Sequence, residues 1–221
     1  MQGPNAAFRT ALLAVLRWRY ALLCAWLLYW SGRKLVQGSD WPLLNLGVEL
    51  LFKGRDPRYE GPGWLHVFAT EPALHMGPLS LVGAAAFRVL YPGTGAVGAA
   101  VFMCALGPLV VLLVERATLR ARGLRDALDD PLLALVTLVS GAAFLVAWAD
   151  VAWAFGRLDE VLVICGGAAT LWLLVNDNPL LAGAAVGLSI GAKPWGVFLL
   201  PSTVSRSSSR THRPKESREW Q

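Results

Sequence analysis

The chain has 221 residues, of which 55% are hydrophobic and only 16% are charged, and its formal net charge at pH 7 is +5. This composition lies outside the range of soluble globular domains and favours helices that fold in a bilayer. The basic residues lie between apolar blocks rather than along one amphipathic face, which argues against nucleic acid as a partner. We therefore expect an all-α, polytopic transmembrane helical bundle of about five to six spans in contact with membrane lipid.

The first predicted span runs from Tyr20 to Val36 and follows three arginines within residues 9–19. Because short basic flanks are retained on the cytoplasmic side of the cell membrane, we expect a cytoplasmic N-terminus. The next segment, residues 37–75, has no apolar run of membrane length and is predicted to be the first external loop. Within this loop, residues 42–52 are predicted to form a short amphipathic helix along the membrane surface.

Two apolar runs follow at residues 76–91 and 96–114, separated by a Pro-Gly-Thr-Gly turn signal. After them comes an arginine-rich segment, residues 115–130, which is predicted to be a charged loop. If both runs crossed the membrane, this loop would be external, whereas the positive-inside rule predicts a cytoplasmic loop. A run of about 16 residues is at the lower limit for crossing a hydrocarbon layer of about 30 Å. We therefore expect one net crossing between residues 76 and 114.

Three more apolar runs are predicted to be spans, at residues 131–148, 161–175 and 180–200, with a polar connector at residues 150–160. The last run contains Gly183, Gly187 and Gly191, which are spaced four residues apart on one helical face. This spacing permits close backbone contact with a neighbouring helix.

The chain is predicted to consist of a transmembrane domain, residues 1–201, and a polar disordered tail, residues 202–221. The composition changes abruptly at this boundary, from a strongly apolar run to a segment rich in serine and arginine. The abrupt change favours a truncated or frame-shifted end, and a genuine polar tail is the alternative.

Two stretches carry a resemblance to a known family. Gly38-Ser39-Asp40 and then Gly54-Arg55-Asp56-Pro57-Arg58-Tyr59 resemble the first loop of polyprenol-phosphate-sugar-dependent membrane glycosyltransferases of the GT-C fold. Gly156-Arg157-Leu158-Asp159-Glu160 and the later segment Ala182 to Trp195 are similar to the actinobacterial mannosyltransferase-like branch. The resemblance covers residues 10–201. It implies the N-terminal half of a hexosyltransferase of the cell envelope, which transfers a sugar from a polyprenyl-phosphate donor to an external acceptor.

By this resemblance, Asp40 corresponds to the catalytic aspartate of the first loop and would act as general base. An inverting transfer requires a carboxylate that accepts the proton of the acceptor hydroxyl. Asp159 and Glu160 would orient the acceptor, assist the base or bind a divalent metal; no other cofactor is expected and no metal ligands are assigned. The structural alternatives are a helix N-cap for Asp40 and a solvated helix start for Asp159 and Glu160.

Arg55, Arg58 and Lys193 are the predicted ligands of the donor phosphate, because guanidinium and ammonium groups form charge-assisted hydrogen bonds with phosphate oxygens. The alternatives are exposed loop charges for Arg55 and Arg58, and snorkelling to the interface for Lys193. A transporter or a structural subunit of a membrane complex is the second functional hypothesis, with Lys193, Asp150 and Asp159 as intramembrane polar sites. Under either hypothesis, a partner chain could supply further helices.

Overall fold

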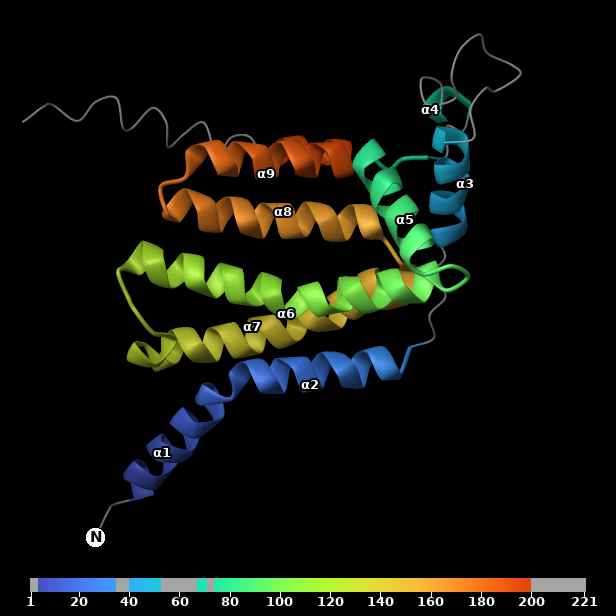
Figure 1. The fold of residues 1–221 in the computed structure, drawn as a ribbon. Coiled ribbons are helices and arrows are strands. Elements are labelled where there is room, and N and C mark those ends of the chain that lie inside the picture. The colour runs from blue at the N-terminus through green and yellow to red at the C-terminus, as the bar shows by residue number, and fades with distance from the viewer. Residues whose placement is uncertain (1–3, 35–39, 53–66, 71–73, 200–221) are drawn as a thin grey trace, which may run out of the picture.

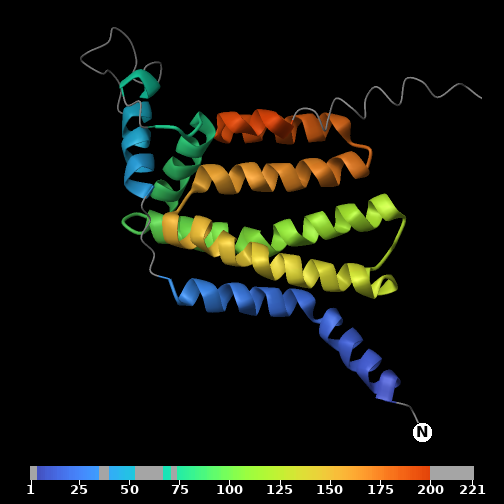
Figure 2. The ribbon, with the colours of Figure 1, turned by 180° about the vertical axis from the view of Figure 1, so that it is seen from behind.

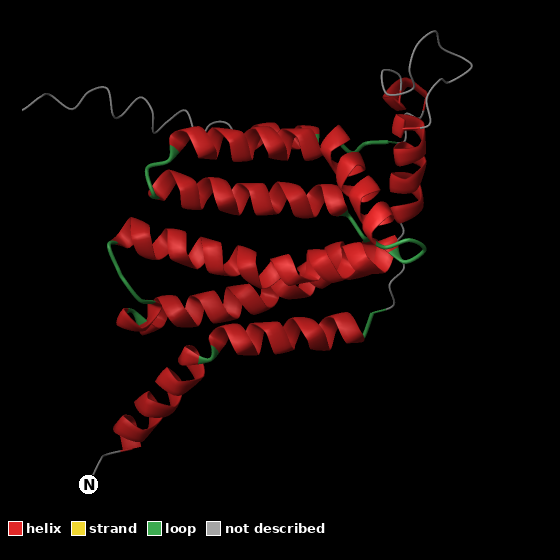
Figure 3. Ribbon diagram, viewed as in Figure 1, coloured by secondary structure: helices red, strands yellow, loops and turns green. Residues whose placement is uncertain are grey.

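The computed structural model describes residues 4–34, 40–52, 67–70 and 74–199, and every regular element within them is helical (Figure 3). The α-helices are α1 (Pro4–Arg17), α2 (Arg19–Gly32), α3 (Trp41–Phe52), α4 (Val67–Thr70), α5 (Pro78–Leu90), α6 (Gly95–Arg122), α7 (Pro131–Ala149), α8 (Leu158–Val175) and α9 (Pro179–Ala192). Short 3-10 turns at Ala127–Asp129 and Pro194–Leu199 and a π-helical turn at Asp150–Phe155 complete these elements. The all-α class is thus confirmed for the described residues. Most of the predicted first loop and the whole predicted tail lie outside them.

Helices α2, α6, α7, α8 and α9 lie side by side along roughly one direction, with α2 and α9 on opposite sides of the bundle (Figures 1 and 2). Helix α8 packs against α9 and α6, and α2 packs against α7. Helix α1 leaves the bundle at a bend of 60° from α2. We call the end that carries α3 and α5 the α3 end. We call the opposite end, where α6 terminates, the arginine end, after Arg116, Arg120, Arg122 and Arg125.

Three helical units of the described residues are long and apolar enough to cross a membrane: α6, α7 with its π-helical turn, and α8. The bent pair α1–α2 would make a fourth, so the expected count of five to six spans is wrong. Helices α5 and α9 have 13 and 14 residues. They are therefore about 20 Å long, less than the hydrocarbon thickness of about 30 Å. Helix α9 ends early because Lys193 is extended, with φ −156° and ψ 133°, and Pro194 lacks an amide hydrogen.

The predicted charged loop at residues 115–130 is wrong in its first half, because α6 continues through Arg122. Arginine, leucine and alanine favour helix, and neither glycine nor proline interrupts the sequence between Pro108 and Gly123. Gly123 has φ 71°, a left-handed conformation that ends the helix. The connector expected at residues 150–160 is likewise shorter, since the π-helical turn extends α7 and α8 begins at Leu158.

Of the two apolar runs within residues 76–114, the first forms α5, which is shorter than a membrane span, and the second forms the start of α6, which is long enough to cross. The single net crossing expected between residues 76 and 114 stays a prediction. Helix α5 lies at the α3 end, and α6 begins at that same end and runs to the opposite one (Figure 1). The end of α7 also lies at the α3 end, close to the residues that follow α2. There Lys34 forms an ion pair with Asp150, and the amide of Asp40 donates a 3.2 Å hydrogen bond to the carbonyl of Phe155.

In the core of the bundle, Trp148 of α7 packs against Gly107 of α6. The buried Trp148 indole donates a 3.0 Å hydrogen bond to the Met103 carbonyl, and its ring lies against Gly107. A Cβ atom at Gly107 would lie 2.6 Å from that ring. By contrast, a Cβ atom at Gly183 or Gly187 would meet nothing within 4 Å among the described residues. The close helix contact that the glycine spacing of α9 permits is therefore not made by described residues at these two positions.

Replacing Gly107 by alanine is expected to lower the free energy of unfolding by about 1–3 kcal/mol, because the added methyl group overpacks the Trp148 site. Thermal unfolding in detergent measures the change. Gly183→Ala is the matched control, since it adds the same methyl group to an open helical position. It is expected to leave stability unchanged or to raise it by up to about 1 kcal/mol. Equal losses in the two variants would contradict the role of Gly107.

Candidate functional site

Five ionisable side chains form a network at the α3 end, which we call the charge cluster: Asp40, Arg157, Asp159, Glu160 and Lys193. Arg157 Nε lies 3.4 Å from Asp40 Oδ2, and Arg157 Nη1 lies 3.2 Å from Glu160 Oε1. Lys193 Nζ lies 3.2 Å from the same Glu160 oxygen and 2.8 Å from Asp159 Oδ2. The charges therefore alternate in sign along a continuous path from Asp40 to Asp159.

The acidic side of the cluster is built by the starts of two helices. Asp40 directly precedes α3, and its backbone bond to Phe155 fixes it beside the turn between α7 and α8. Gly156 makes that turn with φ 69°. Asp159 and Glu160 follow in the first turn of α8, where the helix macrodipole favours negative charge. The local sequence thus brings all three carboxylates to one end of the bundle.

Lys193 is held in place by the junction of α5 and α9. The carbonyl of Ala192 accepts hydrogen bonds from the Gly77 amide at 2.7 Å and from the Ser80 hydroxyl at 2.9 Å. Gly77 has no side chain, and a Cβ atom there would collide with the backbone of Gly191 and Ala192. The start of α5 therefore fastens the end of α9, and Lys193 leaves the helix toward the first turn of α8.

The members of the cluster differ in their exposure. The Asp159 side chain is only 5% exposed and that of Lys193 13%, whereas the Arg157 side chain is 40% exposed. Burial opposes the charge on Lys193, but hydrogen bonds and attraction to Asp159 and Glu160 outweigh it and raise the pKa of Lys193. Lys193 is thus a cation at neutral pH, and Arg157 is the cation of the cluster that is more accessible to a ligand.

Lys193→Met is expected to lower the free energy of unfolding by about 1–3 kcal/mol, because the buried Asp159 loses its charged partner. The pKa of Lys193 is higher in the folded chain than in the unfolded chain, where it is about 10.5. The stabilisation by Lys193 is therefore fully present below about pH 10.5 and is lost as the pH rises through the pKa of the folded chain. The melting-temperature difference between wild type and variant should therefore stay constant from about pH 7 to about pH 9.5 and shrink at higher pH. Lys34→Met, which removes a more exposed pair, is the control. A difference that already shrinks near pH 8 would contradict the raised pKa.

The structure brings together four of the six predicted site residues: Asp40, Asp159, Glu160 and Lys193. The other two, Arg55 and Arg58, lie outside the described residues. Sequence reasoning missed Arg157, which links Asp40 to Glu160. One feature of the sequence could have indicated Arg157. It lies beside the acidic pair Asp159 and Glu160 at the start of an apolar run, in a stretch that resembles the glycosyltransferase family.

A metal site was the alternative for the acidic pair. Within the described residues, no group of three or more His, Cys, Asp or Glu side chains is placed to hold a metal ion. Asp159 and Glu160 instead face Lys193 at 2.8 Å and 3.2 Å. A divalent cation bound by these two carboxylates would therefore compete with the Lys193 ammonium group.

A second ion pair is buried toward the arginine end. Arg19 Nε and Nη2 lie 2.9 Å and 2.5 Å from the two carboxylate oxygens of Glu115. Arg19 Nη1 also donates to the carbonyl of Leu16 at 3.0 Å, and both charged residues are buried. The sequence had indicated a flanking topology charge for Arg19 and the start of a loop for Glu115. The pair instead joins α2 to α6.

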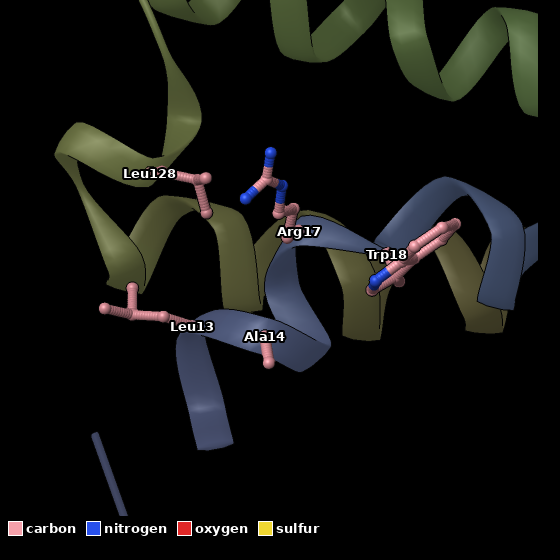
Figure 4. Close-up of a pocket in the computed structure, with 5 residues that line it drawn as sticks. All are labelled: Leu13, Ala14, Arg17, Trp18 and Leu128. Carbon is pink, nitrogen blue, oxygen red and sulfur yellow. The ribbon is translucent and has the colours of Figure 1, made fainter. Parts of the chain in front are cut away.

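A hollow of about 820 Å³ also lies at the arginine end, between α1 and the turn that precedes α7 (Figure 4). Its lining consists of Leu13, Ala14, Arg17, Trp18 and Leu128. Among the described residues of this lining, Arg17 is the one that carries a charge, and none belongs to the charge cluster. The convergence of ionisable groups from separate segments therefore identifies the charge cluster, and not this hollow, as the candidate functional site.

Fold and site together define a helical protein with three to four apolar helices of membrane length, as expected of a multi-pass membrane protein. Comparisons of the chain with protein-family models, with curated proteins and with solved structures found no match.

Proposed function

We propose that this chain is an integral membrane glycosyltransferase of the GT-C type, which transfers a sugar from a polyprenyl-phosphate donor to an acceptor hydroxyl. One observation carries the proposal. Asp40 belongs to the first motif, Asp159, Glu160 and Lys193 belong to the second, and the two groups lie in one ionic network although they are far apart in the sequence.

The position of the charge cluster supports this chemistry. A polyprenyl-phosphate sugar keeps its chain in the bilayer and its phosphate and sugar at the interface, so the enzyme needs its reactive groups at helix ends. The cluster lies where α3 and α8 begin and α9 ends. The arginines at the opposite end favour a cytoplasmic location there, which makes the α3 end external and the N-terminus cytoplasmic in this proposal.

Each member of the cluster has a role in an inverting transfer. Asp40 accepts the proton of the acceptor hydroxyl while the acceptor oxygen bonds to the anomeric carbon and the bond from that carbon to the phosphate oxygen breaks. Arg157 and Lys193 stabilise the negative charge on the departing phosphate. Glu160 contacts both cations and keeps them close together, and Asp159 keeps Lys193 oriented.

One observation favours the second hypothesis, a transporter or structural subunit. Each carboxylate of the cluster faces a cation, as it would in an ion network with a purely structural role. Structural ion networks also shift the pKa values of their members. Such a network would hold the helix ends together without binding a lipid-linked sugar. Donor binding is therefore the property that separates the two hypotheses.

The purified chain in liposomes should retain a radiolabelled polyprenyl-phosphate sugar and transfer the label to acceptors in a donor-dependent manner. Arg157→Ala is expected to weaken donor retention by about 10- to 100-fold, since one charge-assisted hydrogen-bonding partner of the phosphate is lost. Arg33→Ala removes an exposed arginine that follows α2 near the same end and should leave retention unchanged. Absence of both donor retention and transfer in the wild-type chain would contradict the proposed function.

A further inference from the structure

A groove of about 580 Å³ lies between α6, α7 and α8 toward the arginine end, and we call it the α6–α8 groove. On α6 its lining includes Val110, Val114, Thr118 and Arg122, which repeat every four residues along one helical face. These positions extend over about 18 Å of helix, whereas one leaflet of a hydrocarbon layer about 30 Å thick is about 15 Å deep. The groove is therefore as long as the acyl region of a single leaflet.

Three of the polar side chains that line this groove, Glu115, Thr118 and Ser140, already have hydrogen-bond partners in the protein. The Thr118 hydroxyl donates to the Val114 carbonyl at 2.9 Å, and the Ser140 hydroxyl donates to the Val136 carbonyl at 2.6 Å. The carboxylate of Glu115 is held by the buried ion pair with α2. The remaining lining is aliphatic or aromatic apart from Thr137 and Arg122. An aliphatic chain fits such walls better than a polar ligand, which would lose its hydration without gaining new hydrogen bonds.

The groove ends at a cation. Arg122 is the last residue of α6, and its side chain is 57% exposed. Its ion pair with Asp130 is long, at 3.4 Å, and exposed pairs of this kind contribute little. The planar guanidinium group binds phosphate oxygens through paired hydrogen bonds. The groove thus combines an apolar channel of leaflet length with a phosphate ligand at its polar end.

We propose that the α6–α8 groove binds one acyl chain of an anionic phospholipid, whose phosphate is held by Arg122. The phospholipid belongs to the leaflet at the arginine end. The charge cluster lies at the opposite end of the bundle, so this lipid is distinct from the proposed sugar donor. The inference does not depend on the proposed function.

Native mass spectrometry of the purified chain, with phosphatidylglycerol and phosphatidylcholine of identical acyl chains as the two probes, tests the headgroup contact. Arg122→Gln is expected to lower the preference for phosphatidylglycerol by about five-fold, the effect of one basic residue at a membrane surface. Arg120→Gln removes an exposed arginine of the same helix end that does not line the groove, and it should leave the preference unchanged.

Two substitutions on α7 test the acyl-chain contact. Val136→Phe fills the groove and should lower the amount of both bound phospholipids several-fold. Val139→Phe adds the same ring at an exposed position outside the groove and should not. Equal lipid retention by these two variants would overturn the proposal, as would equal effects of Arg122→Gln and Arg120→Gln. A second copy of the chain bound in place of lipid would also overturn it. If Val136→Phe failed to fold, the comparison of Arg122→Gln with Arg120→Gln would still test the proposed lipid site.

Discussion

Asp40→Asn is expected to reduce sugar transfer by about 10²- to 10⁴-fold, the usual contribution of a general base. Asparagine has nearly the same shape as aspartate but cannot accept the proton of the acceptor hydroxyl. It also keeps the backbone hydrogen bond to Phe155, so the start of α3 should stay in place. Donor retention should change much less than transfer, because the predicted phosphate ligands are other residues.

The control for Asp40 is Asp150→Asn, which neutralises a carboxylate at the same end of the bundle that pairs with Lys34. This variant should transfer sugar at nearly the wild-type rate. Thermal unfolding in detergent must show that both variants are folded. Unchanged transfer in Asp40→Asn would show that another group is the base, and an equal loss in Asp150→Asn would indicate a general electrostatic effect.

Glu115→Gln is expected to lower the free energy of unfolding by about 3–5 kcal/mol, because it leaves the Arg19 guanidinium buried without its counter-charge. The carboxylate of Glu115 accepts two hydrogen bonds from Arg19, and the pair joins α2 to α6. Chemical or thermal unfolding in a fixed detergent measures the loss. Exchanging both residues for apolar side chains, Arg19→Met with Glu115→Leu, should restore most of the lost stability.

Glu49→Gln is the matched control for Glu115. Glu49 pairs with Arg88 at 3.3 Å, but the side chains of Arg88 and Glu49 are 46% and 41% exposed. Solvent screens such a pair, so its loss should cost less than about 1 kcal/mol. If Glu115→Gln and Glu49→Gln were equally stable, the buried pair could not be what holds α2 against α6.

Several helices could be predicted from the sequence because apolar runs coincide with clear end signals. The predicted helix at residues 42–52 corresponds to α3 (Trp41–Phe52), and the run at residues 131–148 corresponds to α7 (Pro131–Ala149). The number of spans could not be predicted from hydropathy, because it depends on where the backbone breaks. Trp18, which lies between Arg17 and Arg19, interrupts the first helical pair. The extended Lys193 ends α9 within an otherwise apolar run.

Most residues of the candidate site could be predicted from the sequence, but the contacts between them could not. Asp40, Asp159 and Lys193 were singled out because a charge is costly beside long apolar runs, and by resemblance. The bridge from Arg157 to Asp40 could not be predicted, since it joins the start of α8 to the start of α3 across most of the chain. The pairing of Arg19 with Glu115 was hidden for the same reason, because nothing local in either sequence segment indicates the other.

The formal charges of the cluster do not balance. Asp40, Asp159 and Glu160 contribute three negative charges, and Arg157 and Lys193 contribute two positive ones, so the sum is 2 − 3 = −1. An arriving phosphodiester would add further negative charge in a partly buried setting, where uncompensated charge is costly. Under the proposed function, donor binding would therefore require at least one additional positive charge at this end of the protein. Arg55 and Arg58, which the first-loop motif assigns to the donor phosphate, are available in the sequence to supply it.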